Sequence, residues 1–371
     1  MSNTVNVAIV VGLMVFFTLG TAFIVTSSGE EENSGLDINV IAAVNLDGSG
    51  IFADRELSIT PSTPAEKDAW RGLVIMTPGP GSIQHYMFNK FVDEYLPELT
   101  FSKWAGGTPA SERIYWMQVA PMNMKNTLAS ADGSVINGGF PWEPFLSDIT
   151  ESTGMQLIAR TNDIEPGHPC CMVAAKESFL KNSEGATRLF LTAYMEAVDW
   201  LNAALADRTS NDYKLLVTIT KNFCNLTSDS AISKAFDGLT YTYDFKDDLE
   251  EYVANLIVDF EALGLITKHV NDPAAFANSF INRKYIDQVK AEPSEPTAKK
   301  IRIRVGHLAG DVHQIALMVG VERGIFAKYG LELVRTLCAN GPEVMRMFQL
   351  GVIDIGFLGL PPAVLNTANF R

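Results

Sequence analysis

Apolar and polar positions alternate regularly in the C-terminal part of the chain, residues 301–371. Apolar and basic residues alternate from Ile301 to Val305, which is typical of a strand with one buried face. Apolar runs predict two further strands at residues 331–337 and 353–358, and a turn followed by a helix is predicted after each strand. Three strand–helix units in a row indicate a parallel sheet covered by helices.

Residues 37–290 combine strands and helices in a similar way. Apolar runs predict strands at residues 38–45 and 73–76, and apolar residues at helical spacing predict a long helix over residues 183–207. A polar, proline-containing stretch at residues 291–300 has no apolar period and is predicted to be a linker. The sequence therefore predicts an α/β protein.

Length and charge limit the classes of function. The 371 residues suffice for two domains of ordinary size. The chain has 43 acidic residues against 29 Lys and Arg, which gives a formal net charge of −14. Because nucleic-acid binding needs a basic face, this balance argues against a nucleic-acid partner.

The four cysteines do not predict a disulfide framework in a chain of this length. Cys170 and Cys171 are adjacent and would point to opposite faces of a strand, so we expect buried free thiols. His168 stands two positions before them and raises the alternative of a metal site. Three such residues crowded on extended backbone cannot all face one ion, and no second ligand pair follows in the sequence. We therefore expect no metal ion.

Two glycine-containing turns are candidates for ligand binding. Residues 78–82 form a glycine-rich turn between a predicted strand and a predicted helix, where free N–H groups and the helix dipole can hold an anion. The alternative is an ordinary turn in which Ser82 caps the helix. The second turn, at residues 138–145, follows a predicted strand, and there Trp142 could stack on a ligand and Glu143 could accept a hydrogen bond from an amine. The alternative there is that Trp142 belongs to the core.

The C-terminal part also carries a family resemblance. The segments GIFAKYGLEL, GVIDIGFLG and PPAVL, in this order after the first strand and its glycine-containing turn, resemble the start of ABC-transporter substrate-binding proteins. The nearest group is the nitrate/sulfonate/taurine/bicarbonate type, which shares its fold with the thiamine-pyrimidine precursor binders. The resemblance implies a type 2 periplasmic-binding-protein fold, with two α/β lobes and a ligand cleft between them.

The order of the pieces differs from that of the family. Residues 37–290 resemble the last three-quarters of such a protein, while residues 301–371 resemble its first quarter. This order predicts a circular permutation, in which the linker joins the old termini. A truncated tandem repeat and an exchange of strands between chains are the alternatives. Residues 1–36 are expected to form a membrane segment and spacer, and residues 291–300 a linker. Lobe one would comprise residues 37–70, 176–290 and 301–371, and lobe two residues 71–175.

The N-terminal segment predicts attachment to a membrane. Residues 7–26 contain no charged residue, and about 20 apolar positions are enough for a helix that crosses a bilayer. No Lys or Arg precedes this segment and no convincing cleavage site follows it. We therefore expect an uncleaved single-pass anchor, with the binding domain on the extracellular or periplasmic side. A cleaved signal peptide and a pilin-like assembly helix are the alternatives.

The resemblance implies a solute-binding component of an ABC importer, with no catalytic activity and no cofactor. The expected ligand is a small anionic or heteroaromatic solute of the sulfonate, nitrate, bicarbonate or pyrimidine class. The expected partners are the permease and ATPase subunits. The alternatives are an enzyme that resembles thiamine-pyrimidine synthase and a membrane-anchored sensor or scaffold with a degenerate cleft.

Candidate ligand contacts come from both lobes. His307 and His313 flank the turn after the strand at residue 301, and such a turn lines the cleft in the family. The candidates from lobe one are His307, Asp311, His313, Gln314, Asn340, Gly359, Pro361 and Asn45. The candidates from lobe two are Gly81, Ser82, Ile83, Gln84, His85, Asn137, Phe140, Trp142 and Glu143.

Overall fold

The computed structural model describes residues 37–130 and 135–370. The apolar segment at residues 7–26 lies outside these residues. Within the described part of the chain, no helix is both long and apolar enough to cross a membrane.

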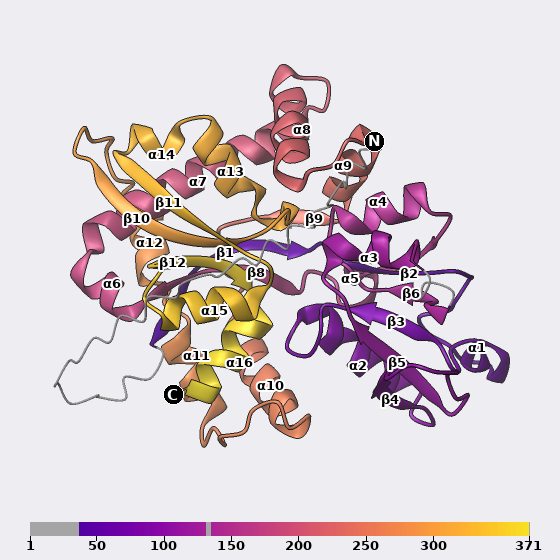
Figure 1. The fold of residues 1–371 in the computed structure, drawn as a ribbon. Coiled ribbons are helices and arrows are strands. Elements are labelled where there is room, and N and C mark those ends of the chain that lie inside the picture. Colours follow the sequence, from indigo (N-terminus) through magenta and orange to yellow (C-terminus); the bar gives the residue numbers. More distant parts are fainter. Residues whose placement is uncertain (1–36, 131–134, 371) are drawn as a thin grey trace, which may run out of the picture. The chain divides into compact units, whose positions relative to one another are not determined.

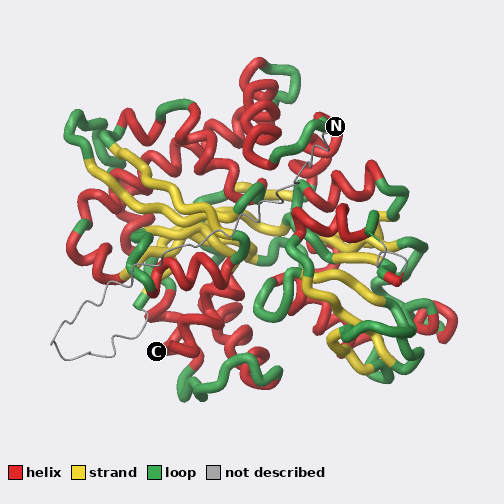
Figure 2. Tube along the Cα trace, viewed as in Figure 1, coloured by secondary structure: helices red, strands yellow, loops and turns green. Residues whose placement is uncertain are grey.

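The described chain contains two six-stranded mixed sheets, each packed against helices (Figures 1 and 2). Sheet one has the strand order β11 (Leu331–Cys338), β10 (Ile301–Leu308), β12 (Ile355–Gly359), β8 (Pro169–Lys176), β1 (Ile38–Asp47) and β9 (Leu239–Tyr241). Sheet two has the order β4 (Thr100–Lys103), β5 (Arg113–Gln118), β3 (Val74–Thr77), β6 (Gly138–Gly139), β2 (Gly50–Ala53) and β7 (Gln156–Arg160). The predicted α/β class is therefore confirmed.

Helices cover both faces of sheet one (Figure 1). On one face lie α7 (Glu184–Ala206), α13 (Ile315–Glu322) and α14 (Ile325–Lys328), and on the other lie α15 (Gly341–Gln349) and α16 (Leu360–Phe370). The remaining helices of this part are α6 (Glu177–Asn182), α8 (Asn211–Cys224), α9 (Asp229–Asp237), α10 (Leu249–Ala262), α11 (Pro273–Phe280), α12 (Lys284–Ala291) and the 3₁₀ helix η2 (Val312–Gln314). The second sheet is accompanied by α1 (Pro64–Asp68), α2 (Ile83–Tyr95), α3 (Pro121–Leu128), α4 (Phe145–Ser152) and α5 (Thr161–Ile164).

The C-terminal strands β11, β10 and β12 form one half of sheet one, with β11 at its edge. β10 pairs in parallel with β11 and β12, as the sequence predicts. β12 also pairs antiparallel with β8, which pairs with β1, so early and late segments of the chain form one sheet. Phe357 of β12 is fully buried against Phe190 and Tyr194 of α7. Burial of each such side chain stabilises the fold by about 1.5–3 kcal/mol. A C-terminal segment folded apart from the rest is excluded, while circular permutation stays a prediction.

The chain passes between the two sheets at places other than those expected from the sequence. It leaves sheet one after β1 and enters sheet two at β2, although we expected the change near residue 71. A tight turn makes this crossing, with a positive φ of 60° at Asp47 and 103° at Gly48. The chain returns through α5 to β8, although we expected lobe two to continue to residue 175. All of β8 belongs to sheet one. Residues 50–68 therefore lie with sheet two, because β1 stops at this turn.

Candidate functional site

A pocket lies where strand ends of the two sheets meet. Sheet two lines it with the residues after β3, the end of β5 and the turn after β6, namely Pro78, Gly79, Pro80, Ser82, Ile83, Gln84, Gln118 and Trp142. Sheet one lines it with the start of β8 and the ends of its three parallel strands, namely Cys170, Cys171, Leu308, Asp311, His313, Asn340, Gly341, Pro342, Gly359 and Pro362. The carboxyl ends of parallel strands are where open α/β sheets bind ligands. The pocket encloses about 580 Å³ of atom-free space, part of it open to solvent.

Helix N-termini supply positive potential to this pocket. α2 begins at Ile83, and the Ser82 hydroxyl accepts a hydrogen bond from the backbone N–H of His85 at 3.2 Å. α15 begins after Asn340, whose side chain accepts from the backbone N–H of Glu343 at 2.9 Å. The free N–H groups and dipoles of such helix ends favour anions. Among the described residues that line the pocket there is no Lys or Arg, so these helix ends and the imidazole of His313 are its sources of positive potential.

Trp142 offers a hydrogen-bond donor at the pocket. Its side chain is buried, and its indole Nε1 has no hydrogen-bond partner within the described part of the chain. A buried N–H without a partner is costly, and most such groups are satisfied in native proteins. An acceptor atom of a bound ligand would satisfy this donor.

Three buried groups on the sheet-one side of the pocket interact closely. His313 Nε2 donates to the carbonyl oxygen of Gly48 at 2.8 Å, and His313 Nδ1 lies 3.4 Å from an Asp311 carboxylate oxygen. Burial lowers the pKa of His313, but the charges of Asp311 and Cys170 overcome this effect and raise the pKa to about 10. Burial raises the pKa of Asp311 to about 6. Hydrogen bonding from the Cys171 thiol, together with the positive charge of His313, holds the pKa of Cys170 well below its usual value.

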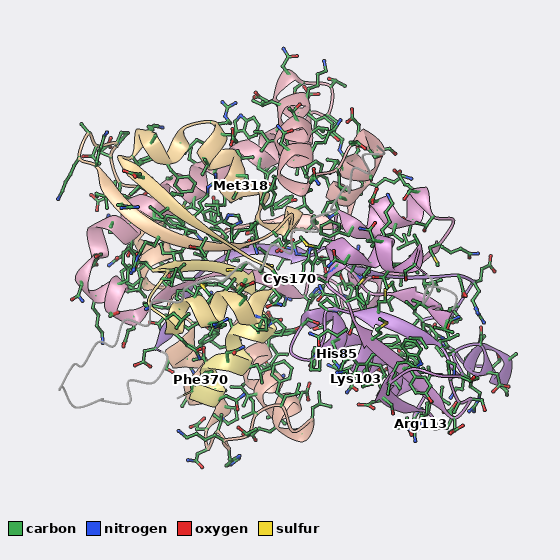
Figure 3. All side chains as sticks on the ribbon, in the orientation of Figure 1. His85, Lys103, Arg113, Cys170, Met318 and Phe370 are labelled. Carbon is green, nitrogen blue, oxygen red and sulfur yellow. The ribbon has the colours of Figure 1, made fainter. Side chains whose placement is uncertain are left out.

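A β-bulge in β8 explains why both cysteines lie on this side. Asn45 of β1 pairs with Cys171 and the next residue, Leu46, pairs with Pro169, so Cys170 is an extra residue in the ladder. A bulge re-aims a side chain that regular alternation would turn to the other face. The Sγ atoms of Cys170 and Cys171 lie 3.6 and 3.7 Å from His313 Nδ1. The expectation of opposite faces was wrong, because it assumed a regular strand. Figure 3 shows Cys170 where the two sheets meet.

The predicted contacts divide into two groups. The structure brings one group together at the pocket, namely Asp311, His313, Asn340, Gly359, Ser82, Ile83, Gln84 and Trp142. Gly81 and Pro361 are adjacent to lining residues but do not line the pocket themselves. His307 lines a different cavity, together with Phe223 and Arg335.

The other predicted contacts are engaged in packing or in hydrogen bonds elsewhere. The side chains of Asn45 and Gln314 are buried and accept from the backbone N–H groups of Cys171 and Leu308, respectively. The remaining four also do not line the pocket. Asn137 accepts from the Val74 N–H, Phe140 is fully buried near Phe88, Glu143 binds Ser147 and Arg160, and His85 binds the Thr77 hydroxyl.

Pro78, Gly79 and Pro80 also line the pocket and belong to the turn at residues 78–82 that the sequence offered as an anion site. Sequence reasoning missed other lining residues, namely Cys170, Cys171, Gln118, Leu308, Gly341, Pro342 and Pro362. Gln118 was accessible to prediction, because it ends a strand next to the one that leads into the glycine-rich turn. The two cysteines were not, because the bulge leaves no mark that we recognise in the sequence.

Comparison with known proteins places this arrangement in a family. A family model described as the NMT1-like family matches residues 2–214, more than half of the chain. The chain belongs to the NMT1-like family. No curated protein matches the sequence of this NMT1-like protein.

Solved structures are similar to this chain at low sequence identity, and one of them has a TM-score above 0.5. The periplasmic nitrate-binding protein NrtA from Synechocystis PCC 6803 is 13% identical with a TM-score of 0.52, over 69% of this chain and 68% of NrtA. A zinc-bound ligand-binding component of an ABC-type import system from Staphylococcus aureus is 15% identical with a TM-score of 0.47, over 68% of this chain and 74% of that one. The alkanesulfonate-binding protein SsuA from Xanthomonas axonopodis pv. citri, bound to MOPS, is 11% identical with a TM-score of 0.46, over 68% of this chain and 75% of SsuA. The resemblance predicted from the sequence is thus confirmed at the level of family and fold.

Proposed function

We propose that this NMT1-like protein is the extracytoplasmic solute-binding component of an ABC importer and that it captures a small anionic solute in the pocket described above. The family, and the fold shared with a nitrate-binding protein, support the class of function. Permease and ATPase subunits would then be its partners, and the apolar segment at residues 7–26 would tether it to the membrane.

The chemistry of the pocket favours an oxyanion. The observation that carries the proposal is that Trp142 lines the pocket and that its buried indole N–H has no partner in the described chain. The N-termini of α2 and α15 border the same pocket from opposite sheets. A sulfonate, nitrate or carboxylate group could accept from Trp142 and from first-turn N–H groups at once. A heteroaromatic solute would instead stack on the indole ring of Trp142.

Polar contacts between the two sheets' helices would hold the bound form closed. The Tyr86 hydroxyl of α2 donates to a carboxylate oxygen of Asp259 on α10 at 2.5 Å. Glu151 of α4 binds Lys234 of α9 at 2.7 Å. We infer that a ligand between the sheets stabilises these contacts and that opening breaks them, with the two crossings of the chain as hinges.

A ligand screen tests the proposal. Thermal unfolding is followed with sulfonates, nitrate, bicarbonate, pyrimidines and amino-acid-like anions, and a ligand at 100 times its dissociation constant should add about 2.7 kcal/mol of stability. Trp142→Phe removes the indole N–H and should weaken an oxyanion ligand by about 10- to 150-fold, since a hydrogen bond to a charged group contributes about 1.5–3 kcal/mol. Trp200→Phe is the matched control, because its indole Nε1 also has no partner in the described chain and does not line the pocket.

The outcomes separate the alternatives. If no anion stabilises the protein, or if Trp142→Phe binds as tightly as the parent, the proposed oxyanion site is wrong. Preference for pyrimidines over anions would favour the heteroaromatic solute. Chemical conversion of a bound solute, followed by NMR, would favour an enzyme resembling thiamine-pyrimidine synthase over a binding protein.

A further inference from the structure

Cys170, Cys171 and His313 form a cluster that the proposed solute site does not require. Their two Sγ atoms and one imidazole nitrogen lie within 4.8 Å of one another, and all three residues are buried. They come from segments more than 140 residues apart, since His313 belongs to η2 and the cysteines begin β8. Three donor atoms converging in this way call for an explanation beyond packing.

The donors have the spacing of a tetrahedral metal site. Zn–S bonds of about 2.3 Å and Zn–N bonds of about 2.05 Å at a tetrahedral angle place sulfur and nitrogen about 3.6 Å apart. The two thiols lie 3.6 and 3.7 Å from His313 Nδ1, which fits this edge length without rearrangement. Two thiolates with one imidazole suit a thiophilic cation such as Zn²⁺ rather than Mg²⁺ or Ca²⁺, which prefer oxygen ligands.

The surroundings of His313 orient the correct nitrogen. Its Nε2 lies 2.8 Å from the Gly48 carbonyl, which can only accept, so this nitrogen carries a proton and Nδ1 faces the thiols. Metal-ligating histidines commonly donate their other ring N–H to such a carbonyl. Gly48 has a φ of +103°, and a Cβ there would lie 2.3 Å from His313 Nε2. Only glycine therefore lets the carbonyl approach the ring in this way.

A second buried histidine stands close to the cluster in sequence without belonging to it. His168 is 1% exposed, and its Nε2 has no hydrogen-bond partner in the part of the chain that the structure describes. Its Nδ1 lies 3.0 Å from a carboxylate oxygen of Asp47, which fixes the ring. His168 is not one of the three converging ligands, but it stands two residues before Cys170 and can support a thiolate there.

We propose that Cys170, Cys171 and His313 bind a thiophilic divalent cation of the Zn²⁺ class. All three residues line the solute pocket, so the fourth coordination position borders it and is open to water or to a ligand. The bound state needs both cysteines as thiolates and Nδ1 without a proton, and any protons that these atoms carry before binding are released to solvent. This site stands on the cluster alone and does not depend on the identity of the solute.

Metal titration of the tag-free, reduced chain tests the site. Zn²⁺ is measured in competition with a chromophoric chelator, and Co²⁺ is added as a spectroscopic substitute that shows thiolate charge-transfer bands. We expect one ion per chain. Cys170→Ser, Cys171→Ser and His313→Gln should each weaken Zn²⁺ by more than about 100-fold, since loss of a supporting residue alone costs 10–100-fold. The glutamine keeps an N–H that can reach the Gly48 carbonyl.

Cys338→Ser is the control, because Cys338 is a buried free cysteine outside the cluster. It should leave the affinity and the Co²⁺ bands unchanged. Circular dichroism of each metal-free variant checks the fold. The site is refuted if the parent does not bind one Zn²⁺ ion per chain. It is also refuted if the folded Cys170→Ser/Cys171→Ser variant binds Zn²⁺ as tightly as the parent does. Anion binding by metal-free protein would survive that refutation, so the two proposals fail separately.

Discussion

Replacement of His85 by asparagine should change how stability depends on pH. The imidazole is buried between Phe101 and Trp116, with ring centroids at 5.2 and 4.8 Å, and its Nδ1 lies 3.0 Å from the Thr77 hydroxyl. Burial lowers the pKa of His85 from its ordinary 6.5 to about 4. Figure 3 places His85 with sheet two rather than beside Cys170.

The sign of the effect follows from proton binding. Between pH 6.5 and about 4 the unfolded chain protonates this histidine while the folded chain does not. The stability contributed by neutral His85 is therefore present above pH 6.5 and is lost as the pH falls toward 4. Since one pKa unit corresponds to about 1.4 kcal/mol, the full loss is about 3 kcal/mol. Between about pH 7.5 and about pH 5 it amounts to roughly 2 kcal/mol.

Urea unfolding at several pH values measures this difference. His85→Asn keeps a polar atom near Thr77 but cannot be protonated, so its stability should fall less with acidity than that of the parent. Other titrating groups contribute equally to both proteins and cancel in the comparison. His269→Asn is the control, because His269 is exposed with 72% of its side chain accessible. Parallel stability–pH curves for the parent and His85→Asn would refute the reasoning.

Three further substitutions test contacts around the site. Glu143→Gln removes the buried charge that pairs with Arg160, and we expect a loss of about 3 kcal/mol in urea unfolding; a loss below about 1 kcal/mol would contradict a buried pair. Asn340→Ala should cost about 1 kcal/mol by removing the cap of α15, and Asn340→Asp should restore it; equal stability of both variants would argue against the cap. Tyr86→Phe should cost about 1.5–3 kcal/mol of stability in the ligand-bound, closed form by removing the bond to Asp259, and an unchanged midpoint of thermal unfolding with ligand present would contradict it.

The sequence was sufficient to predict the local order of strands and helices. The alternation at Ile301–Val305 lies in β10, and the apolar run at residues 353–358 overlaps β12. These two strands are parallel neighbours. This worked because side-chain alternation and helical spacing are local consequences of burial. The crossing between sheets was misplaced, since the turn at Asp47 and Gly48 looks like any hairpin loop until the pairing partners of β2 are known.

Candidate contacts were harder to predict, because a polar residue at a strand end can either contact a ligand or form hydrogen bonds within the protein. Asp311 and Gln314 are three residues apart on one turn, yet only Asp311 lines the pocket. The Gln314 amide is used inside the protein, where it accepts from Leu308 N–H and donates to the Phe357 carbonyl. Both uses favour the same residue types at the same positions. The choice between them depends on backbone partners from other strands, which no local pattern contains.

The cluster at Cys170 depends on three segments that meet only in the folded chain. The bulge in β8 sets the direction of the thiols, the turn at Gly48 supplies the carbonyl that orients His313, and the C-terminal segment supplies His313 itself. Because β12 bridges β10 and β8, loss of the C-terminal strands would remove the histidine and also the neighbour that holds the bulged strand. The donor geometry is therefore tied to completion of sheet one. A chain whose early and late segments did not share this sheet could keep both cysteines and still lack the site.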